Sequence, residues 1–203
     1  MANIAINTYL FYGDRDELAK CHAALSKLYE KCGTNECCVE LSDPSTNAEW
    51  FDYVSSLSDH DEKIEIGTNS KWYGNPVYWN NWTKENFPKL SMAFRCEESS
   101  MGIFEQIDPD HKLDEVIYLS GDPIPDEDVA KLPTNLQKII QDNNDCKYVY
   151  GTFLKSEIFS DDFKPSDLPD SISYNEFAEA TYEEVDASNN AFNAVFNLKF
   201  PTV

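Results

Sequence analysis

The sequence predicts an α+β protein built on an antiparallel sheet, and two patterns in its 203 residues carry this prediction. Apolar and polar residues alternate along residues 90–97, as in a strand that buries one face. Residues 14–33 instead place apolar side chains at helical intervals, which indicates an amphipathic helix. Hydrophobic residues make up 41% of the chain and aromatic residues 13%, enough to build a packed core.

A strand over residues 4–12 is predicted first, with apolar residues on both of its sides, as expected of a central strand. Asp14 follows as the N-cap of a helix, with Glu17 at the spacing of a capping box. Gly33 is the predicted end of this helix. One apolar stripe runs along the helix and consists of Leu18, Cys21, Leu25, Leu28 and Cys32.

The middle of the chain contains the richest aromatic stretch, residues 64–98. From residue 38 to residue 97, the sequence pattern predicts a short strand at 38–41, a helix at 47–57, strands at 62–66 and 72–79, a short helix at 83–87 and a strand at 90–97. With an insertion at about 34–60 set aside, the elements follow the order βα and then ββαβ. This is the order of a ferredoxin-like split βαβ fold, in which an antiparallel sheet carries both helices on one face.

The second half of the chain predicts a C-terminal α+β extension. Its expected elements are a strand at 116–119, helical pieces at 126–131 and 134–142, a strand at 146–154, an acidic loop at 156–172, a helix at 173–185 and a strand at 191–200. Ser173 and Glu176 form the capping-box pattern that predicts the last helix. We therefore expect a ferredoxin-like domain over residues 1–107 and an acidic extension over 108–203 that packs on the first sheet or continues it.

Several short motifs in the first domain resemble one known family. They are Met1-Ala2-Asn3, Asn7, Gly13, Ile66-Gly67-Thr68, Lys71-Trp72, Trp79, Phe87-Pro88-Lys89-Leu90, Glu97, Glu98, Met101 and Gly102. Over residues 1–107 the chain resembles the YubB-like ferredoxin-like proteins of phages, plasmids and prophages. It departs from them at Trp79, which Asn80-Asn81-Trp82 follow where the family has prolines. The resemblance implies a ferredoxin-like fold on a mobile element, and it supplies no catalytic residues.

The net charge of −21 is concentrated in two segments. Residues 97–128 contain eleven acidic residues and one base, and residues 157–186 contain ten acidic residues and one base. An acidic run is usually a solvated surface that aids solubility. A field of this sign and concentration also repels nucleic acid and anionic membranes, and it attracts basic protein surfaces and cations.

These observations favour a binding protein over an enzyme, because the chain has no phosphate loop, nucleophile elbow or metalloprotease motif. We expect an acidic accessory protein of the phage type that binds a basic surface of a host protein. It would act as a nucleic-acid mimic and inhibit a defence or nucleic-acid-processing enzyme such as a CRISPR effector. The expected partner-binding residues are Asp108, Asp110, Asp114, Glu115, Asp126, Glu127, Asp128, Asp161, Asp162, Asp167, Asp170, Trp72 and Trp82.

Two alternatives stay open at this point. A metal-dependent enzyme or metal-binding protein would use carboxylates such as Asp108, Asp110 and Asp114 around His111. A nucleic-acid module would stack bases on aromatic residues of the stretch 64–98, which otherwise form a core or a protein-contact patch.

No cofactor is expected. Cys32, Cys37 and Cys38 are interpreted as free thiols, with a zinc site as the less favoured hypothesis because their spacing lacks the paired Cys-x-x-Cys pattern. The N-terminal residues have no basic and apolar leader, and no run of 18 apolar residues occurs, so we expect a cytoplasmic protein.

Overall fold

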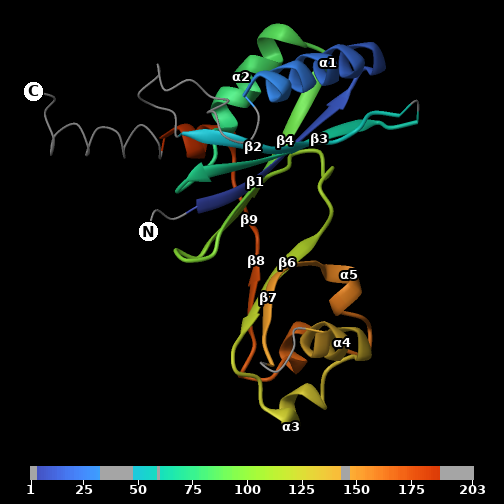
Figure 1. Ribbon diagram of the computed structural model, residues 1–203, viewed down its shortest axis with the longest axis vertical. Coiled ribbons are helices and arrows are strands. Elements are labelled where there is room, and N and C mark those ends of the chain that lie inside the picture. Colours follow the sequence, from blue (N-terminus) through green and yellow to red (C-terminus); the bar gives the residue numbers. More distant parts are fainter. Residues whose placement is uncertain (1–3, 33–47, 59, 143–146, 188–203) are drawn as a thin grey trace, which may run out of the picture. The chain divides into compact units, whose positions relative to one another are not determined.

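The computed structural model describes residues 4–32, 48–58, 60–142 and 147–187 of an α+β chain. The chain forms two compact units, Met1–Leu113 with Ala178–Val203 and Asp114–Phe177 (Figure 1). The sequence places the boundary after residue 107 and assigns everything beyond it to one extension. In the structure the first unit continues to Leu113, and the chain returns to this unit at Ala178.

The first unit is a mainly antiparallel sheet that carries its two longest helices on one face (Figure 1). Among the described residues, its strands follow the order β2-β3-β1-β4-β5-β9, and only the short β5–β9 pair is parallel. The elements in chain order are β1 (Ile4–Gly13), α1 (Arg15–Cys32), β2 (Glu49–Val54), β3 (Lys63–Lys71), α2 (Pro76–Asn86), β4 (Leu90–Glu98), β5 (Ile103–Ile107) and β9 (Ala178–Glu179).

The predicted first strand and first helix are confirmed. Strand β1 is central and pairs with β3 and β4. The Glu17 N–H donates to Asp14 Oδ1 at 3.2 Å, so Asp14 is the N-cap that the sequence indicates. The Glu17 carboxylate does not close the capping box, because it accepts the Lys89 N–H at 2.8 Å. The buried members of the helical stripe are Leu18, Cys21, Leu25 and Cys32.

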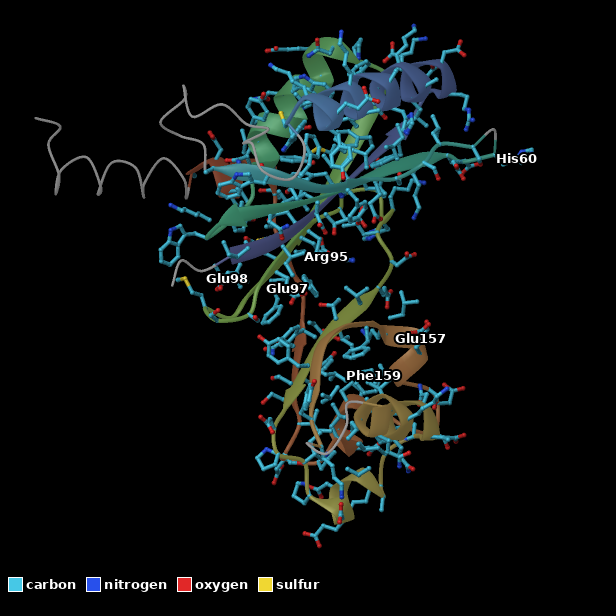
Figure 2. The ribbon with its side chains drawn as sticks, in the orientation of Figure 1. His60, Arg95, Glu97, Glu98, Glu157 and Phe159 are labelled. Carbon is cyan, nitrogen blue, oxygen red and sulfur yellow. The ribbon has the colours of Figure 1, made fainter. Side chains whose placement is uncertain are left out.

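The core of the first unit lies between the sheet and the two helices. Strand β4 confirms the predicted alternation, since Leu90, Met92, Phe94 and Cys96 are all buried. They meet the inward residues of the central strand and of the helices, including Tyr9, Phe11, Leu25 and Trp79. This arrangement leaves the face of the sheet that carries Arg95 turned away from α1 and α2 (Figure 2).

Two predicted elements between residues 47 and 79 are wrong. The expected helix at 47–57 is strand β2, which pairs with β3 and contains the aromatic and β-branched residues that favour strands. Of the expected strand at 72–79, residues 72–75 form an irregular connection and residues 76–79 begin α2, which starts at Pro76. Proline is well placed there, because the first helical turn leaves its N–H groups without helical partners. The predicted strand at 38–41 lies outside the described residues.

The second unit has a three-stranded antiparallel sheet in the order β7-β6-β8. Its own core joins this sheet to α4 through Ile117, Leu119, Leu136, Ile140 and Val149. The elements in chain order are β6 (Val116–Gly121), α3 (Asp126–Val129), α4 (Thr134–Asp142), β7 (Val149–Leu154), α5 (Lys155–Ile158), the 3₁₀ turn Pro165–Asp167 and β8 (Ser173–Glu176).

Most predicted elements of this region are confirmed, namely the strand at 116–119, the two helical pieces and the described part of the strand at 146–154. The helix predicted at 173–185 is wrong. Residues 173–176 form β8, paired with β6 through Ile117–Glu176 and Ser120–Ser173, and only residues 182–187 of the described chain are helical there. The strand predicted at 191–200 lies outside the described residues.

Candidate functional site

Glu49, the first residue of β2, is a fully buried carboxylate with donors from three other elements. The Tyr9 hydroxyl on β1 donates to its Oε1 at 2.8 Å, and the Thr68 hydroxyl on β3 donates to the same oxygen. Its Oε2 accepts from Asn75 Nδ2 at 2.7 Å and from Trp79 Nε1 at 3.2 Å, at the start of α2. Sequence reasoning missed this site.

Burial dominates the electrostatics of this group. Loss of hydration raises the pKa of Glu49 above its usual range, while the hydrogen bonds from Thr68, Asn75, Tyr9 and Trp79 act in the opposite direction. Burial, and then the nearby Glu49 carboxylate, raises the pKa of the Tyr9 hydroxyl far above its ordinary value. The Tyr9 hydroxyl therefore stays protonated and keeps donating to Glu49.

Asn7 extends the network along β1. Its Nδ2 donates to Ser70 Oγ at 2.9 Å and to Thr68 Oγ1 at 3.3 Å. Its Oδ1 is buried and has no hydrogen-bond partner in the described part of the chain. Gly74 packs so closely that a Cβ there would lie 2.7 Å from this oxygen and 2.6 Å from the Tyr9 hydroxyl. The network is therefore tightly packed, and it anchors β2 and the start of α2 to the sheet.

The loop after β5 contains two expected partner-binding residues, which the structure places differently. Asp108 is only 4% exposed, and its carboxylate accepts the backbone N–H groups of Lys112 at 2.8 Å and Leu113 at 2.7 Å. Asp108 thus shapes the loop, and it presents little carboxylate to a partner. Asp110 is exposed and accepts the Tyr12 hydroxyl at 3.0 Å.

The metal-dependent alternative depends on how closely acidic, histidine and cysteine side chains gather. Within residues 4–32, 48–58, 60–142 and 147–187, no three His, Cys, Asp or Glu side chains are placed to hold a metal ion. Cys21 and Cys32 are buried in the first core, and burial raises the pKa of the Cys21 thiol to about 12. Cys37 and Cys38 of the zinc hypothesis lie outside the described residues.

The two expected partner-binding tryptophans differ in exposure. Trp72 is 48% exposed and has a positive φ of 70°, just after β3. Trp82 packs edge-on against Phe11, Trp79 and Phe87 in the first core. Only Trp72 of this pair therefore presents a large surface to a partner. Most aromatic residues of the stretch 64–98 belong to the core of the first unit. This agrees with the alternative that they form a core.

The adjacent acids Glu97 and Glu98 do not form a catalytic pair, because neighbouring strand residues point to opposite faces of a sheet. Glu98 is buried, and its carboxylate accepts the Met101 N–H at 2.6 Å in the β4–β5 turn. Figure 2 labels both residues near this end of β4. Glu98 therefore stabilises a hairpin.

A broad depression in the first unit was also missed from the sequence. Its volume is about 1300 Å³, and His60 and His111 both belong to its wall. Arg15, Lys63 and Lys112 are balanced there by Asp61, Glu62 and Glu65. Among the described lining residues, the three Arg and Lys side chains therefore equal the three Asp and Glu side chains in number.

The acidic residues of the second unit lie mainly at its surface. Three of its lysines form ion pairs: Lys131 with Asp128 at 2.9 Å, Lys147 with Asp126, and Lys155 with Glu115 at 4.0 Å and with Glu176 at 2.9 Å. Asp128 also accepts the Ser171 hydroxyl and is partly buried. Asp114, in contrast, is exposed. Seven exposed acids of this unit form no ion pair with a lysine or arginine of the described chain, namely Asp122, Glu127, Glu157, Asp161, Asp162, Asp167 and Asp170.

Two short features bring some of these acids together. Asp126, Glu127 and Asp128 are consecutive residues of α3. Asp161 and Asp162 occupy the turn closed by the bridge between Ser160 and Phe163. Four further expected residues of this unit lie elsewhere along the chain, Asp114 and Glu115 before β6 and Asp167 and Asp170 before β8. The structure thus supplies exposed carboxylates on several segments of one unit.

Comparison with known proteins found no matching family model, no matching curated protein and no matching solved structure. No helix of the described chain has both the length and the apolar character needed to cross a membrane.

Proposed function

We propose that this chain is an acidic binding protein whose second unit docks on a basic surface of a partner protein. The observation that carries this proposal is the set of seven exposed acids in that unit without an ion pair to a lysine or arginine among the described residues. In the free protein these like charges repel one another. A basic partner relieves this repulsion, so charge complementarity favours both encounter and binding.

The partner class proposed here is a nucleic-acid-binding enzyme of the host. Such enzymes present lysine and arginine side chains to phosphates, and exposed carboxylates spaced over several segments are able to occupy the same positions. The resemblance of residues 1–107 to phage-type proteins supports an inhibitor of a defence enzyme, for example a CRISPR effector. The acidic unit would then block the nucleic-acid channel of that enzyme.

The fold of the first unit is proposed to be ferredoxin-like. Its first six elements follow the order βαββαβ, and the strand order β2-β3-β1-β4 is antiparallel throughout. Both helices pack on one face of this sheet. Strands β5 and β9 extend the sheet beyond β4.

Partner binding by a charge-reduced variant tests the proposed function. The full chain is used to capture proteins from the natural host, and the candidate partner is then purified and titrated at 50 and 500 mM NaCl. The variant carries Asp161→Asn, Asp162→Asn and Asp167→Asn. A control with the same change in charge carries Asp16→Asn, Glu30→Gln and Glu85→Gln, which are exposed residues of α1 and α2.

We expect binding at 50 mM NaCl that weakens at least tenfold at 500 mM, because salt screens exposed charges. The variant in the second unit should bind at least tenfold more weakly, and the control should bind like the wild type. Single-stranded nucleic acid should compete with the chain for the partner. Equal binding by the wild type and by the second-unit variant would contradict the proposed function.

A further inference from the structure

The second unit contains a surface hollow that the acidic residues alone do not explain. Its volume is about 630 Å³. The described residues that line it are Ser120, Gly121, Asp122, Tyr148, Val149, Tyr150, Ser171 and Ser173. They come from the end of β6, the beginning of β7 and the beginning of β8 with the residues around them.

Strand register explains why a hollow forms at this place. Ser120 on the central strand pairs with Tyr150 on β7 and with Ser173 on β8, so the three side chains form a row across the sheet. Ile117 and Leu119 point from β6 into the core beneath α4, and Ser120 therefore points to the opposite face. Two small serines beside one tyrosine leave a space with an aromatic wall.

Neighbouring groups shape the wall and one side of this hollow. Tyr150 is 61% exposed, and its ring contacts the Tyr118 ring edge-on at 5.3 Å between centroids. On that side, a Cβ on Gly121 would lie 2.6 Å from the Ser171 carbonyl oxygen. Glycine therefore lets the end of β6 approach the segment before β8, and this approach closes the hollow on one side.

The lining combines an aromatic face, hydroxyl groups and one carboxylate. Asp122 is exposed and forms no ion pair with a lysine or arginine of the described chain. Lys147, next to the lining residue Tyr148, forms an ion pair with Asp126. The charge of Asp122 is therefore not neutralised by that lysine.

We propose that this hollow binds an arginine side chain of the partner's basic surface; the inference rests on the proposed function. A guanidinium group is planar and stacks on a tyrosine ring, and its N–H groups donate to a carboxylate and to hydroxyl oxygens at the same time. A lysine ammonium is a more strongly hydrated point charge and stacks less well. The hollow thus recognises one residue type, whereas the other exposed acids of the unit attract any basic surface.

Titration of the isotope-labelled full chain with N-acetyl-arginine amide tests this inference by nuclear magnetic resonance. Arginine should shift the backbone resonances of residues 120–122, 148–150 and 171–173. N-acetyl-citrulline amide, a neutral molecule of nearly the same shape, should bind at least tenfold more weakly, and N-acetyl-lysine amide should fall between the two. Equal binding of citrulline and arginine would overturn the inference, because it would mean that the hollow takes neutral ligands.

Two substitutions separate the aromatic wall from the charge. Tyr150→Ala and Asp122→Asn should each weaken arginine binding at least fivefold, while Tyr150→Phe should bind like the wild type because the ring is kept. Glu157→Gln is the matched control, since Glu157 is an exposed acid on α5 and outside the hollow (Figure 2). The spectrum of each variant reports whether it is folded. Arginine shifts that are unchanged in Tyr150→Ala and Asp122→Asn would overturn the inference.

The outcomes also separate this inference from the proposed function. The variant with Asp161→Asn, Asp162→Asn and Asp167→Asn should still bind arginine amide in the hollow, because none of the three residues lines it. If arginine amide fails to bind but the partner is bound in a salt-dependent manner, only the inference about the hollow is lost. If arginine amide binds but the partner titration shows no dependence on the acids, only the proposed function is lost.

Discussion

The Tyr9 hydroxyl donates to Glu49 Oε1 at 2.8 Å between two fully buried side chains. The same hydroxyl accepts the backbone N–H of Asn75 at 2.8 Å. One phenol group therefore links the central strand, the edge strand β2 and the start of α2. Buried polar groups are costly unless they are paired, so each partner in this network stabilises the others.

Removing the Tyr9 hydroxyl should destabilise the first unit. The Tyr9→Phe variant takes one donor from Glu49 and leaves the Asn75 N–H without its acceptor, a loss that costs about 1–3 kcal/mol. Chemical denaturation monitored by tryptophan fluorescence measures this change in the free energy of unfolding. Tyr12→Phe is the matched control, because Tyr12 bonds to the exposed Asp110 and its loss should cost less than about 1 kcal/mol. Equal costs for the two variants would contradict the role of the buried network.

Glu49 should make the stability of the protein fall as pH rises. Because burial raises the folded-state pKa of Glu49, the folded state holds the proton more tightly than the unfolded state does. Its contribution is therefore fully present below the unfolded pKa of about 4.3 and is lost as pH rises through the folded pKa. The loss is about 1.4 kcal/mol for each unit by which the folded pKa is raised.

The Glu49→Gln variant isolates this contribution, since glutamine does not titrate. The free energy of unfolding of the wild type minus that of the variant should be larger at pH 4 than at pH 8. Denaturation curves at one-unit pH intervals measure this difference, and other acids cancel between the two proteins. A difference that stays constant from pH 4 to pH 8 would mean that the Glu49 pKa is the same in both states.

Replacing Asp108 should lower the stability of the protein more than replacing Asp110, two residues further along the chain. The Asp108→Ala variant removes a buried carboxylate and leaves the partly buried N–H groups of Lys112 and Leu113 without their acceptor, so a cost of about 1–3 kcal/mol is expected. Asp110→Ala removes the same charge from an exposed side chain and should change stability by less than about 1 kcal/mol. Thermal unfolding of both variants distinguishes a structural Asp108 from a purely surface charge.

The core of the second unit should respond to substitution in α4. Leu136 is fully buried there, and Leu136→Ala should cost about 2–5 kcal/mol. Lys138→Ala, an exposed change on the same helix, should stay within about 0.5 kcal/mol. Hydrogen exchange should become faster in β6 and β7, because Leu136 packs in a cluster whose members all belong to this unit. Faster exchange in β1 and β3 alone would contradict this.

The sequence predicted correctly those elements that are determined by nearby residues or by a strong amphipathic pattern. The strand ending at Gly13 and the helix capped by Asp14 follow from hydrophobic periodicity and a capping side chain within a few residues. The helix from Thr134 to Asp142 is similar, since its buried Leu136 and Ile140 are four residues apart. In each case the residues that decide the structure are close together in the chain.

The wrong predictions concern segments whose structure is determined by residues far away in the sequence. Ser173 and Glu176 fit a capping box, yet pairing with β6 makes the segment a strand. Glu49 was missed because its donors lie up to 40 residues away in sequence. One signal was present: Glu49 and Phe51 fall on the same side of a strand, so recognising β2 would have indicated an inward-facing carboxylate.

The return of the chain to the first unit sets an order for its folding during synthesis. Strand β9 pairs with β5, the Ala180 N–H donates to the Gln106 carbonyl oxygen at 2.8 Å, and the Tyr182 hydroxyl donates to the Met92 carbonyl oxygen at 2.6 Å. All of these contacts come from residues that leave the ribosome after the whole second unit. The outer edge of β5 therefore stays open in the nascent chain until residues 178–182 emerge, and an open strand edge is a site of aberrant pairing.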